Sequence, residues 1–156
     1  MLHGRLRFAV AVLMTCFLSV PAAPWAADKA SQSDAQQIAL KAAAFIKDKG
    51  IEAGRSAFDA EGEFKYGEVY VNVIDEKGVR LIYPPKPTAV NLDVSEAQDV
   101  DGKYLIKDIL DVAKAKGEGW TQYRWTNPVT KKIDEKVTYV KHVPERSVVV
   151  FVDVYK

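Results

Sequence analysis

The final part of the chain holds three strand-like segments in succession, and these constrain the fold more than any other feature. The segments cover residues 119–126, 135–143 and 147–155. Asn127 and Pro128 separate the first two, and Pro144 and Glu145 separate the last two. Such residues mark turns, and short turns join strands that lie side by side. The pattern therefore predicts a three-stranded antiparallel meander at the C-terminus.

A second antiparallel pair is predicted upstream of the meander. In residues 69–74, valines alternate with Tyr70, Asn72 and Ile74, which is typical of a strand with large side chains on both faces. Residues 75–78 form a turn signal that ends in glycine, and residues 79–83 form the returning strand. Prolines from residue 84 onward begin a long connection that reaches about residue 100.

Two helices complete the expected architecture. Ser31 with Asp34, or Ser33 with Gln36, can form a capping box that begins the first helix. That helix ends at Gly50 and is followed by a shorter helical piece over residues 51–58. The second helix covers residues 104–116, with Asp99 or Asp101 as its cap and Gly117 as its end. The order of elements predicts an α+β domain whose antiparallel sheet of about five strands is partly covered by helices.

The N-terminus has the three parts of a secretory signal peptide. Arg5 and Arg7 give a positive start, residues 8–20 form an apolar segment without charge, and residues 21–27 contain helix breakers and small residues. The apolar segment is shorter than the roughly 20 residues that a membrane-spanning helix needs. We therefore expect residues 1–27 to be a cleaved export signal that directs the protein to the periplasm.

Two details of this signal leave alternatives open. Cleavage is expected after Ala27, with Ala22 or Ala26 as other possible sites, and an uncleaved membrane anchor is the competing interpretation. Cys16 lies within the apolar segment. The residues before it are not the small ones that precede a lipidated cysteine, and apolar residues follow it. We interpret Cys16 as an ordinary residue of the apolar segment.

Removal of residues 1–27 changes the composition of the chain. Lys and Arg fall from 22 to 20 against 21 Asp and Glu, so the formal net charge moves from +1 to about −1. This balance argues against nucleic acid or an anionic membrane as a partner. The only cysteine is lost, so no disulfide is expected. We divide the mature chain into a flexible segment, residues 28–34, and a single domain, residues 35–156.

Aromatic side chains are concentrated in the late strands. Strand alternation places Tyr123 and Trp125 on one face of their strand, and Tyr139 and Lys141 on one face of the next. If the two faces coincide, these four side chains surround one patch with an apolar wall, polar tips and a cation for an anionic ligand. The alternative is that the aromatic residues belong to the core and that Lys141 lies at its rim.

Other chemistry has little support in the sequence. The acidic residues at 93, 96, 99 and 101 lack the oxygen pattern of a calcium loop, so a solvated loop with a helix cap is the better interpretation. His142, the one histidine of the mature chain, cannot hold a transition metal by itself. Neither Ser56 nor Ser147 lies in a nucleophile motif. We therefore expect no metal, no cofactor and no enzymatic activity.

The order and spacing of short motifs resemble a known family. They are Gly119, Trp120, Tyr123, Trp125, Asn127 and Pro128, then Lys136, Tyr139, Val140 and Lys141, then Val154 and Tyr155, with upstream matches at residues 75–78, 83–84, 91–93, 99 and 101–103. Together they resemble the single Cache domain of type 2 over about residues 35–156. The chain departs from the family at Asp153, where the family usually has glycine, and a side chain at this position can alter the floor of the pocket or the pairing of the last strand.

This resemblance implies a PAS-like extracytoplasmic fold in which a long N-terminal helix packs on a curved antiparallel sheet. It also implies a pocket between the sheet and the long connection that begins at residue 84. In the family this pocket is often occupied by a small carboxylate or a similar metabolite. Carried over to this chain, Tyr123, Trp125 and Tyr139 become pocket candidates and Lys141 becomes the charge partner. Tyr70, on the first strand, is a weaker candidate.

We therefore expect a periplasmic sensory domain that binds a small organic acid, with residues 84–102 closing over it. The chain ends at Lys156, one residue past the last predicted strand, so we expect a free-standing domain without a membrane span after cleavage. Signalling would then require a membrane-bound or periplasmic partner protein. The alternative is an accessory protein that uses the same fold to dock another protein and binds no small ligand.

Overall fold

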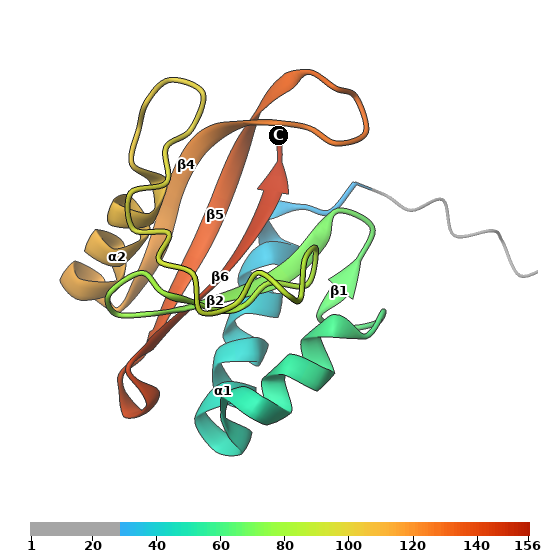
Figure 1. Ribbon diagram of the computed structural model, residues 1–156. Coiled ribbons are helices and arrows are strands. Elements are labelled where there is room, and N and C mark those ends of the chain that lie inside the picture. The colour runs from blue at the N-terminus through green and yellow to red at the C-terminus, as the bar shows by residue number, and fades with distance from the viewer. Residues whose placement is uncertain (1–28) are drawn as a thin grey trace, which may run out of the picture.

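The computed structural model describes residues 29–156. Two α-helices, one short 3-10 helix and six strands follow in the order α1, β1, β2, β3, α2, β4, β5, η1, β6 (Figure 1). Their bounds are α1 Gln32–Asp59, β1 Lys65–Tyr66, β2 Val69–Asp75, β3 Arg80–Ile82, α2 Leu105–Lys116, β4 Glu118–Thr126, β5 Ile133–Val143, η1 Pro144–Arg146 and β6 Val148–Tyr155. The predicted α+β class and its antiparallel sheet are confirmed. The predicted export signal lies outside the described residues.

The six strands form one antiparallel sheet. Its order is β1-β2-β6-β5-β4, and β3 pairs with β2. The C-terminal strand β6 therefore lies between β2 and β5 in the middle of the sheet, and every one of its residues is buried. The two predicted substructures, hairpin and meander, are joined through this strand.

Helix α1 begins and bends where the sequence indicates. The Ser31 side chain accepts a hydrogen bond from the backbone N–H of Asp34, and the Asp34 side chain accepts one from the backbone N–H of Ser31. The backbone of Gly50 is not helical, with φ of 82°, so α1 consists of two helical pieces joined at a kink. A residue with a Cβ adopts this conformation only at a cost, which explains glycine at the kink.

The two helices cover opposite faces of the sheet (Figure 1). One core cluster joins α1 to the alternating side chains Val69, Val71 and Val73 of β2 and to Val150 and Val152 of β6. The other cluster joins α2 to strand residues whose side chains point to the opposite face of the sheet, among them Ile74, Val140 and Phe151. Between β3 and α2, the segment of residues 83–104, which we call the crossing segment, runs over the face that carries α2.

One expectation about α2 was wrong. Neither Asp99 nor Asp101 caps this helix. The residue at its N-cap position is Tyr104, and no side chain makes a capping hydrogen bond there. Gly117 ends the helix in a left-handed conformation, as predicted, and its N–H donates to the carbonyl of Ala113. Within residues 29–156, neither helix is long and apolar enough to cross a membrane.

Replacement of Gly78 tests how closely the crossing segment approaches the β2–β3 hairpin. Gly78 has a φ of 91°, and a Cβ there would lie 2.9 Å from Ser95 Cβ and 3.1 Å from Ser95 Cα. Gly102 has a similar φ of 81°, but a Cβ there would meet no atom within 4 Å. A left-handed alanine costs about 1–2 kcal/mol, and overpacking adds about 1–3 kcal/mol. We expect Gly78→Ala to lower the free energy of unfolding in urea more than Gly102→Ala does; equal losses would contradict the close contact.

Candidate ligand-binding pocket

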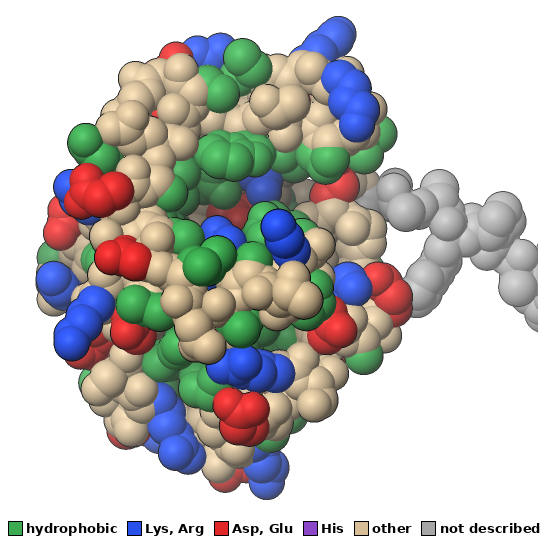
Figure 2. Space-filling model, viewed as in Figure 1, with side chains coloured by type: hydrophobic (Ala, Val, Ile, Leu, Met, Phe, Trp, Pro, Cys, Tyr) green, Lys and Arg blue, Asp and Glu red, His purple; other side chains and the backbone are tan. Residues whose placement is uncertain are grey.

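A cavity of about 80 Å³ lies between the sheet and the crossing segment, on the face that carries α2. Its floor comes from β2, β5 and β6, its walls from β4 and α2, and its cover from the crossing segment. Figure 2 shows a hollow on this face, with basic and acidic atoms in its depth beneath hydrophobic ones. The cavity lies where the sequence resemblance implies a pocket.

Three of the predicted site residues line this cavity. Tyr70 projects from β2, and Tyr123 and Trp125 project from β4. The rings of Tyr123 and Trp125 meet edge to face with centroids 6.1 Å apart, a favourable aromatic geometry. Tyr123 is buried, whereas Trp125 is 42% exposed at the rim. Tyr70 meets Tyr83 of the crossing segment in the same edge-to-face way, at 5.9 Å.

Tyr139 and Lys141 do not join them. Trp120, not Tyr123, lies opposite Tyr139 in the β4–β5 pair, and the two rings are 4.8 Å apart. Tyr139 belongs to the core cluster under α1, and the Lys141 ammonium pairs with Glu118 at 2.8 Å. The expected grouping of all four side chains around one patch is therefore wrong. A strand shifted by one residue turns every side chain to the other face, and residue spacing alone does not fix that shift.

The register brings Lys136, Thr138 and Asp153 to the cavity face instead. Lys136 lies opposite Tyr123 on β4 and opposite Tyr155 on β6, and Thr138 lies opposite Asp153. Lys136 and Asp153 both line the cavity and are each only 4% exposed. Sequence reasoning did not place Lys136 in the site, although strand alternation separates it from Tyr139. Asp153 stands out in the sequence only as a departure from the family pattern.

Asp153 is the centre of a buried polar network. Its Oδ1 accepts a hydrogen bond of 2.6 Å from the Thr138 hydroxyl, and its Oδ2 accepts one of 3.2 Å from the Asn72 amide. The Lys136 ammonium lies 3.8 Å from Oδ2. Because Asn72 is on β2, Thr138 and Lys136 on β5, and Asp153 on β6, one carboxylate links the three strands of the floor.

The Lys136 ammonium retains unused hydrogen-bonding capacity. It lies 4.7 Å from the ring centroid of Tyr155 and 5.5 Å from that of Tyr70, distances typical of cation–π contacts. Within residues 29–156, its nearest carboxylate oxygen is the one on Asp153, beyond hydrogen-bonding distance. A buried ammonium with three N–H donors thus faces a cavity with at least one donor free.

The tyrosines around this network remain protonated well above neutral pH. Burial, and then the negative charge of Asp153, raise the pKa of Tyr70 and Tyr123 far above the ordinary value of 10.0. Burial, and then the charge of Glu68, raise the pKa of Tyr155 to about 12. Tyr70 and Tyr123 therefore keep their phenol protons at neutral pH, and side-chain hydrogen bonds of Tyr70 to Tyr83 and of Tyr123 to Asp153 add to the rise in pKa.

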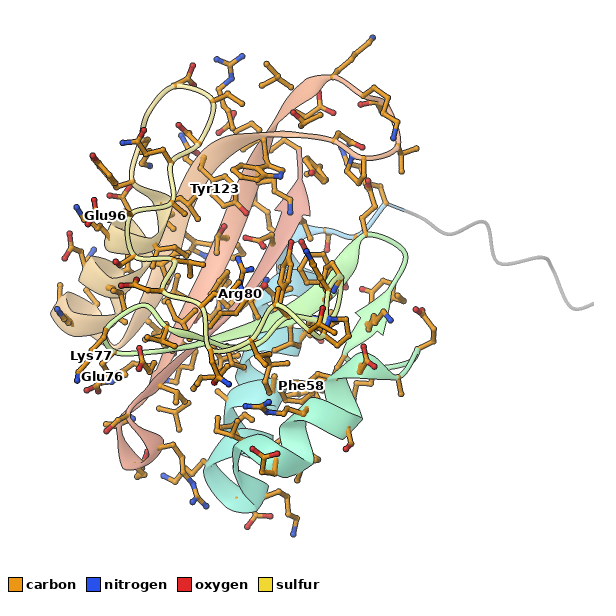
Figure 3. All side chains as sticks on the ribbon, in the orientation of Figure 1. Phe58, Glu76, Lys77, Arg80, Glu96 and Tyr123 are labelled. Carbon is orange, nitrogen blue, oxygen red and sulfur yellow. The ribbon has the colours of Figure 1, made fainter. Side chains whose placement is uncertain are left out.

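Arg80 adds a second cation to the lining of the cavity, where β3 borders it. It comes from β3 and lines the cavity together with Tyr123 of β4 (Figure 3). Its guanidinium carbon lies 4.1 Å from the centroid of the Tyr83 ring, so it stacks on that ring. Arg80 is half-buried, in contrast to Lys136. Water screens its charge more than that of the buried pair.

Asp99 fastens the crossing segment to the edge of the sheet. Its Oδ1 accepts hydrogen bonds of 2.9 Å from the N–H groups of Asp101 and Lys103, and its Oδ2 accepts one of 3.1 Å from the N–H of Arg124 on β4. Burial alone would raise the pKa of this carboxyl, but the three backbone donors outweigh burial and lower it. The acidic run around Asp99 therefore organises a loop.

His142 has a partner on the same side of the molecule as the β2–β3 turn. Its Nε2 lies 2.8 Å from Oε1 of Glu76. In the part of the chain that the structure describes, no three His, Cys, Asp or Glu side chains come together in a way that could hold a metal ion.

The family of the chain follows from a comparison with family models. The model of the family described as "Single Cache domain 2" matches residues 17–156. The chain belongs to this family. The matched region contains every described element of the fold.

Solved structures share the fold of this chain. One is described as "Periplasmic sensor domain of chemotaxis protein", with 23% identity, a TM-score of 0.62, and coverage of 79% of this chain and 88% of that one. A second, a "Cache chemosensory domain", has 19% identity, a TM-score of 0.62, and coverage of 79% and 86%. A third, a methyl-accepting chemotaxis protein from Vibrio parahaemolyticus, has 18% identity, a TM-score of 0.59, and coverage of 79% and 81%.

Alkaline titration tests the burial of the pocket tyrosines. A group whose pKa is raised on folding contributes stability that is complete below its unfolded pKa, here 10.0, and is lost as the pH rises through the folded value. We expect the free energy of unfolding to fall as the pH rises above 10, and Tyr123→Phe to reduce that fall. Phenolate absorbance and circular dichroism measure both effects. If all tyrosines ionised near pH 10 without structural change, the burial of these tyrosines would be contradicted.

Asp99→Ala tests how the crossing segment is held. Loss of hydrogen bonds to a charged group costs about 1.5–3 kcal/mol, and we expect the amides of residues 101, 103 and 124 to exchange hydrogen faster. Asp93→Ala is the matched control, because Asp93 is exposed and its side chain accepts a backbone hydrogen bond from Ser95 alone. The lowered pKa of Asp99 makes its contribution complete above pH 3.8 and lost as the pH falls through the lowered value. The variant and the wild type should therefore converge in stability in acid; a constant difference would contradict the assignment.

Proposed function

We propose that this protein is a periplasmic sensory domain that binds a small organic carboxylate and reports its occupancy to a partner protein. The observation that carries the proposal is the buried ammonium of Lys136, which faces the cavity without a hydrogen bond to Asp153. In this proposal Lys136, and not Lys141, is the charge partner of the ligand.

Burial of an ammonium is unfavourable unless the group is paired and hydrogen-bonded. Asp153 supplies opposite charge at 3.8 Å but no hydrogen bond at that distance. A ligand carboxylate in the cavity would supply charge-assisted hydrogen bonds to the free N–H groups, and such bonds are the strong ones in proteins. The phenol groups of Tyr70 and Tyr123 line the same cavity.

The remaining walls suit a small organic molecule. Apolar side chains from the sheet, α2 and the crossing segment line the cavity, among them Ile74, Leu105, Ile106 and Phe151. Trp125 lies half-exposed at the rim, where its ring can cover a bound ligand. The volume of about 80 Å³ favours a small ligand.

The descriptions of similar structures support this class of ligand. One of them concerns "carboxylic acid recognition by a Cache chemosensory domain", and two others are chemotaxis proteins. For this chain, we infer export to the periplasm through the signal peptide over residues 1–27. A membrane-bound or periplasmic partner would then read the state of the domain.

Ligand binding can be reported only if it favours one arrangement of the domain over another. The crossing segment is the element in a position to change, because it covers the cavity and also carries Tyr83 and Val94 of its lining. Asp99 fastens one end of this segment to β4. A ligand between the sheet and the segment would stabilise the closed arrangement.

Calorimetric titration of the full chain with acetate, propionate and other small monocarboxylates tests the proposal. We expect at least one of these carboxylates to bind. Lys136→Met should weaken its binding at least tenfold. Lys141→Met should leave the affinity unchanged, because Lys141 is on the opposite face of the sheet. Trp125→Ala should weaken binding several-fold without loss of stability, because Trp125 is at the rim. This variant keeps the test valid if Lys136→Met, which leaves Asp153 unpaired, does not fold.

Two results would overturn the proposal. One is the absence of binding by the folded wild-type protein to any small carboxylate, α-amino acids included, which would favour a protein-docking role instead. The other is a loss of binding with Lys141→Met while Lys136→Met and Trp125→Ala bind normally. Thermal unfolding of each variant checks that the loss of binding is not a loss of structure.

A further inference from the structure

The cavity has two buried charges of opposite sign, although a carboxylate ligand needs only one. Lys136 and Asp153 are each 4% exposed, both line the cavity, and Nζ and Oδ2 are 3.8 Å apart. Such a pair is costly to bury, and replacement by apolar residues is often neutral or stabilising. Stability alone therefore gives no reason for Asp153 in the pocket.

Asp153 has room for one more hydrogen-bond donor. Thr138 donates to Oδ1, Asn72 donates to Oδ2, and the Tyr123 phenol is a third side-chain hydrogen-bond partner. An ionised carboxylate has about four acceptor sites. The residue lines the cavity, so a donor that enters the cavity can reach it. A ligand that carries only acceptors cannot use this capacity.

The charge of Asp153 also acts against a simple carboxylate. The buried pair is neutral as a unit, so the charge of a monocarboxylate close to Asp153 is balanced only by Arg80, which is half-buried. In a buried site this repulsion is screened less than in water. A second negative charge on the ligand would increase it further. Arg80 offsets part of this repulsion but is better screened by water.

We propose that Asp153 makes the pocket specific for a small α-amino acid in its zwitterionic form. This inference rests on the proposed function and names its ligand class. The α-carboxylate pairs with the Lys136 ammonium, and the α-ammonium donates to the free acceptor site of Asp153. A zwitterionic amino acid carries one negative and one positive group on neighbouring carbons. Lys136 and Asp153 present the opposite charge to each of these groups, and their charged atoms are 3.8 Å apart.

The cavity limits the side chain of that amino acid. The cavity is small, about 80 Å³, and its wall includes the apolar side chains Leu105, Ile106 and Phe151, so a small apolar side chain suits it better than a large or charged one. No further charged side chain of the described residues lines the cavity apart from Arg80. Glycine and alanine are therefore the amino acids that fit best.

Titration of the full chain with matched ligands tests this inference. Alanine, lactate and propionate have nearly the same shape and differ in the α-substituent, which is an ammonium, a hydroxyl or a hydrogen. We expect alanine or glycine to bind at least tenfold more tightly than propionate and lactate. Asp153→Asn retains the shape and an acceptor oxygen but removes the charge. We expect it to weaken alanine binding at least tenfold and to strengthen propionate binding.

Asp134→Asn is the matched control. Asp134 lies opposite Trp125 in the β4–β5 pair, and its side chain accepts a hydrogen bond from Thr130 at the outer turn. Asp134 does not line the cavity, so we expect the ligand preference of this variant to equal that of the wild type. Circular dichroism checks the fold of both variants. If Asp153→Asn does not fold, the comparison of alanine with propionate on the wild type decides the matter.

Each result separates the inference from the proposed function. If propionate binds wild type as tightly as alanine, the inference is wrong and the proposed function stands. If lactate binds as tightly as alanine, a neutral hydrogen-bond donor suffices and the preference for a zwitterion is wrong. If Asp153→Asn keeps the preference for alanine, Asp153 is not its cause. If no ligand binds the folded protein, the proposed function fails as well.

Discussion

The buried carboxylate of Asp153 is the interaction on which the cavity face of this domain depends. It accepts hydrogen bonds from Asn72 on β2 and Thr138 on β5, and it is the nearest opposite charge to Lys136. These partners come from both strands that flank β6. A strand shifted by one residue would bury Asp153 under α1 without them. Such a shift is unfavourable because an unpaired buried charge is costly, so the network specifies the register of the central strands.

The same sheet performs two different tasks on its two faces. Toward α1, the side chains of β2 and β6 are valines, and they form a dry core with the helix. Toward the crossing segment, the same strands present Tyr70, Asn72, Phe151 and Asp153. The alternation of side chains along a strand makes this division possible. The stability of the α1 face allows the opposite face to keep a cavity and a buried ion pair.

Sequence reasoning predicted the elements better than the site. The capping box at Ser31, the kink at Gly50 and the end of α2 at Gly117 all depend on neighbouring residues, so local sequence was sufficient. The faces of β4 and β5 depend on how the two strands pair across residues 127–132, which alternation within one strand does not determine. Tyr139 and Lys141 were placed with Tyr123 for this reason.

Lys136 was missed for a related reason, and Asp153 was noted only for its possible effect on the pocket floor or on the pairing of the last strand. Lys136 is one of several charged residues of β5, whereas Asp153 is the one charged residue of β6. Only the pairing of β5 with β6 brings the two side chains to one cavity. Asp99 was interpreted as a helix cap because it precedes α2. Its three donors include the N–H of Arg124, which is far along the chain, and no local pattern indicates such a contact.

The position of Asp153 links these observations to the family resemblance, in which glycine usually stands at this place. Glycine would leave space at the floor and an unpaired Lys136, a site suited to any small anion. Asp153 occupies part of that space and supplies a fixed charge beside the ammonium. The cavity becomes smaller and its buried charge becomes balanced. In the proposed site a ligand compensates both charges, so this one side chain would change the ligand class while the fold and the aromatic walls remain the same.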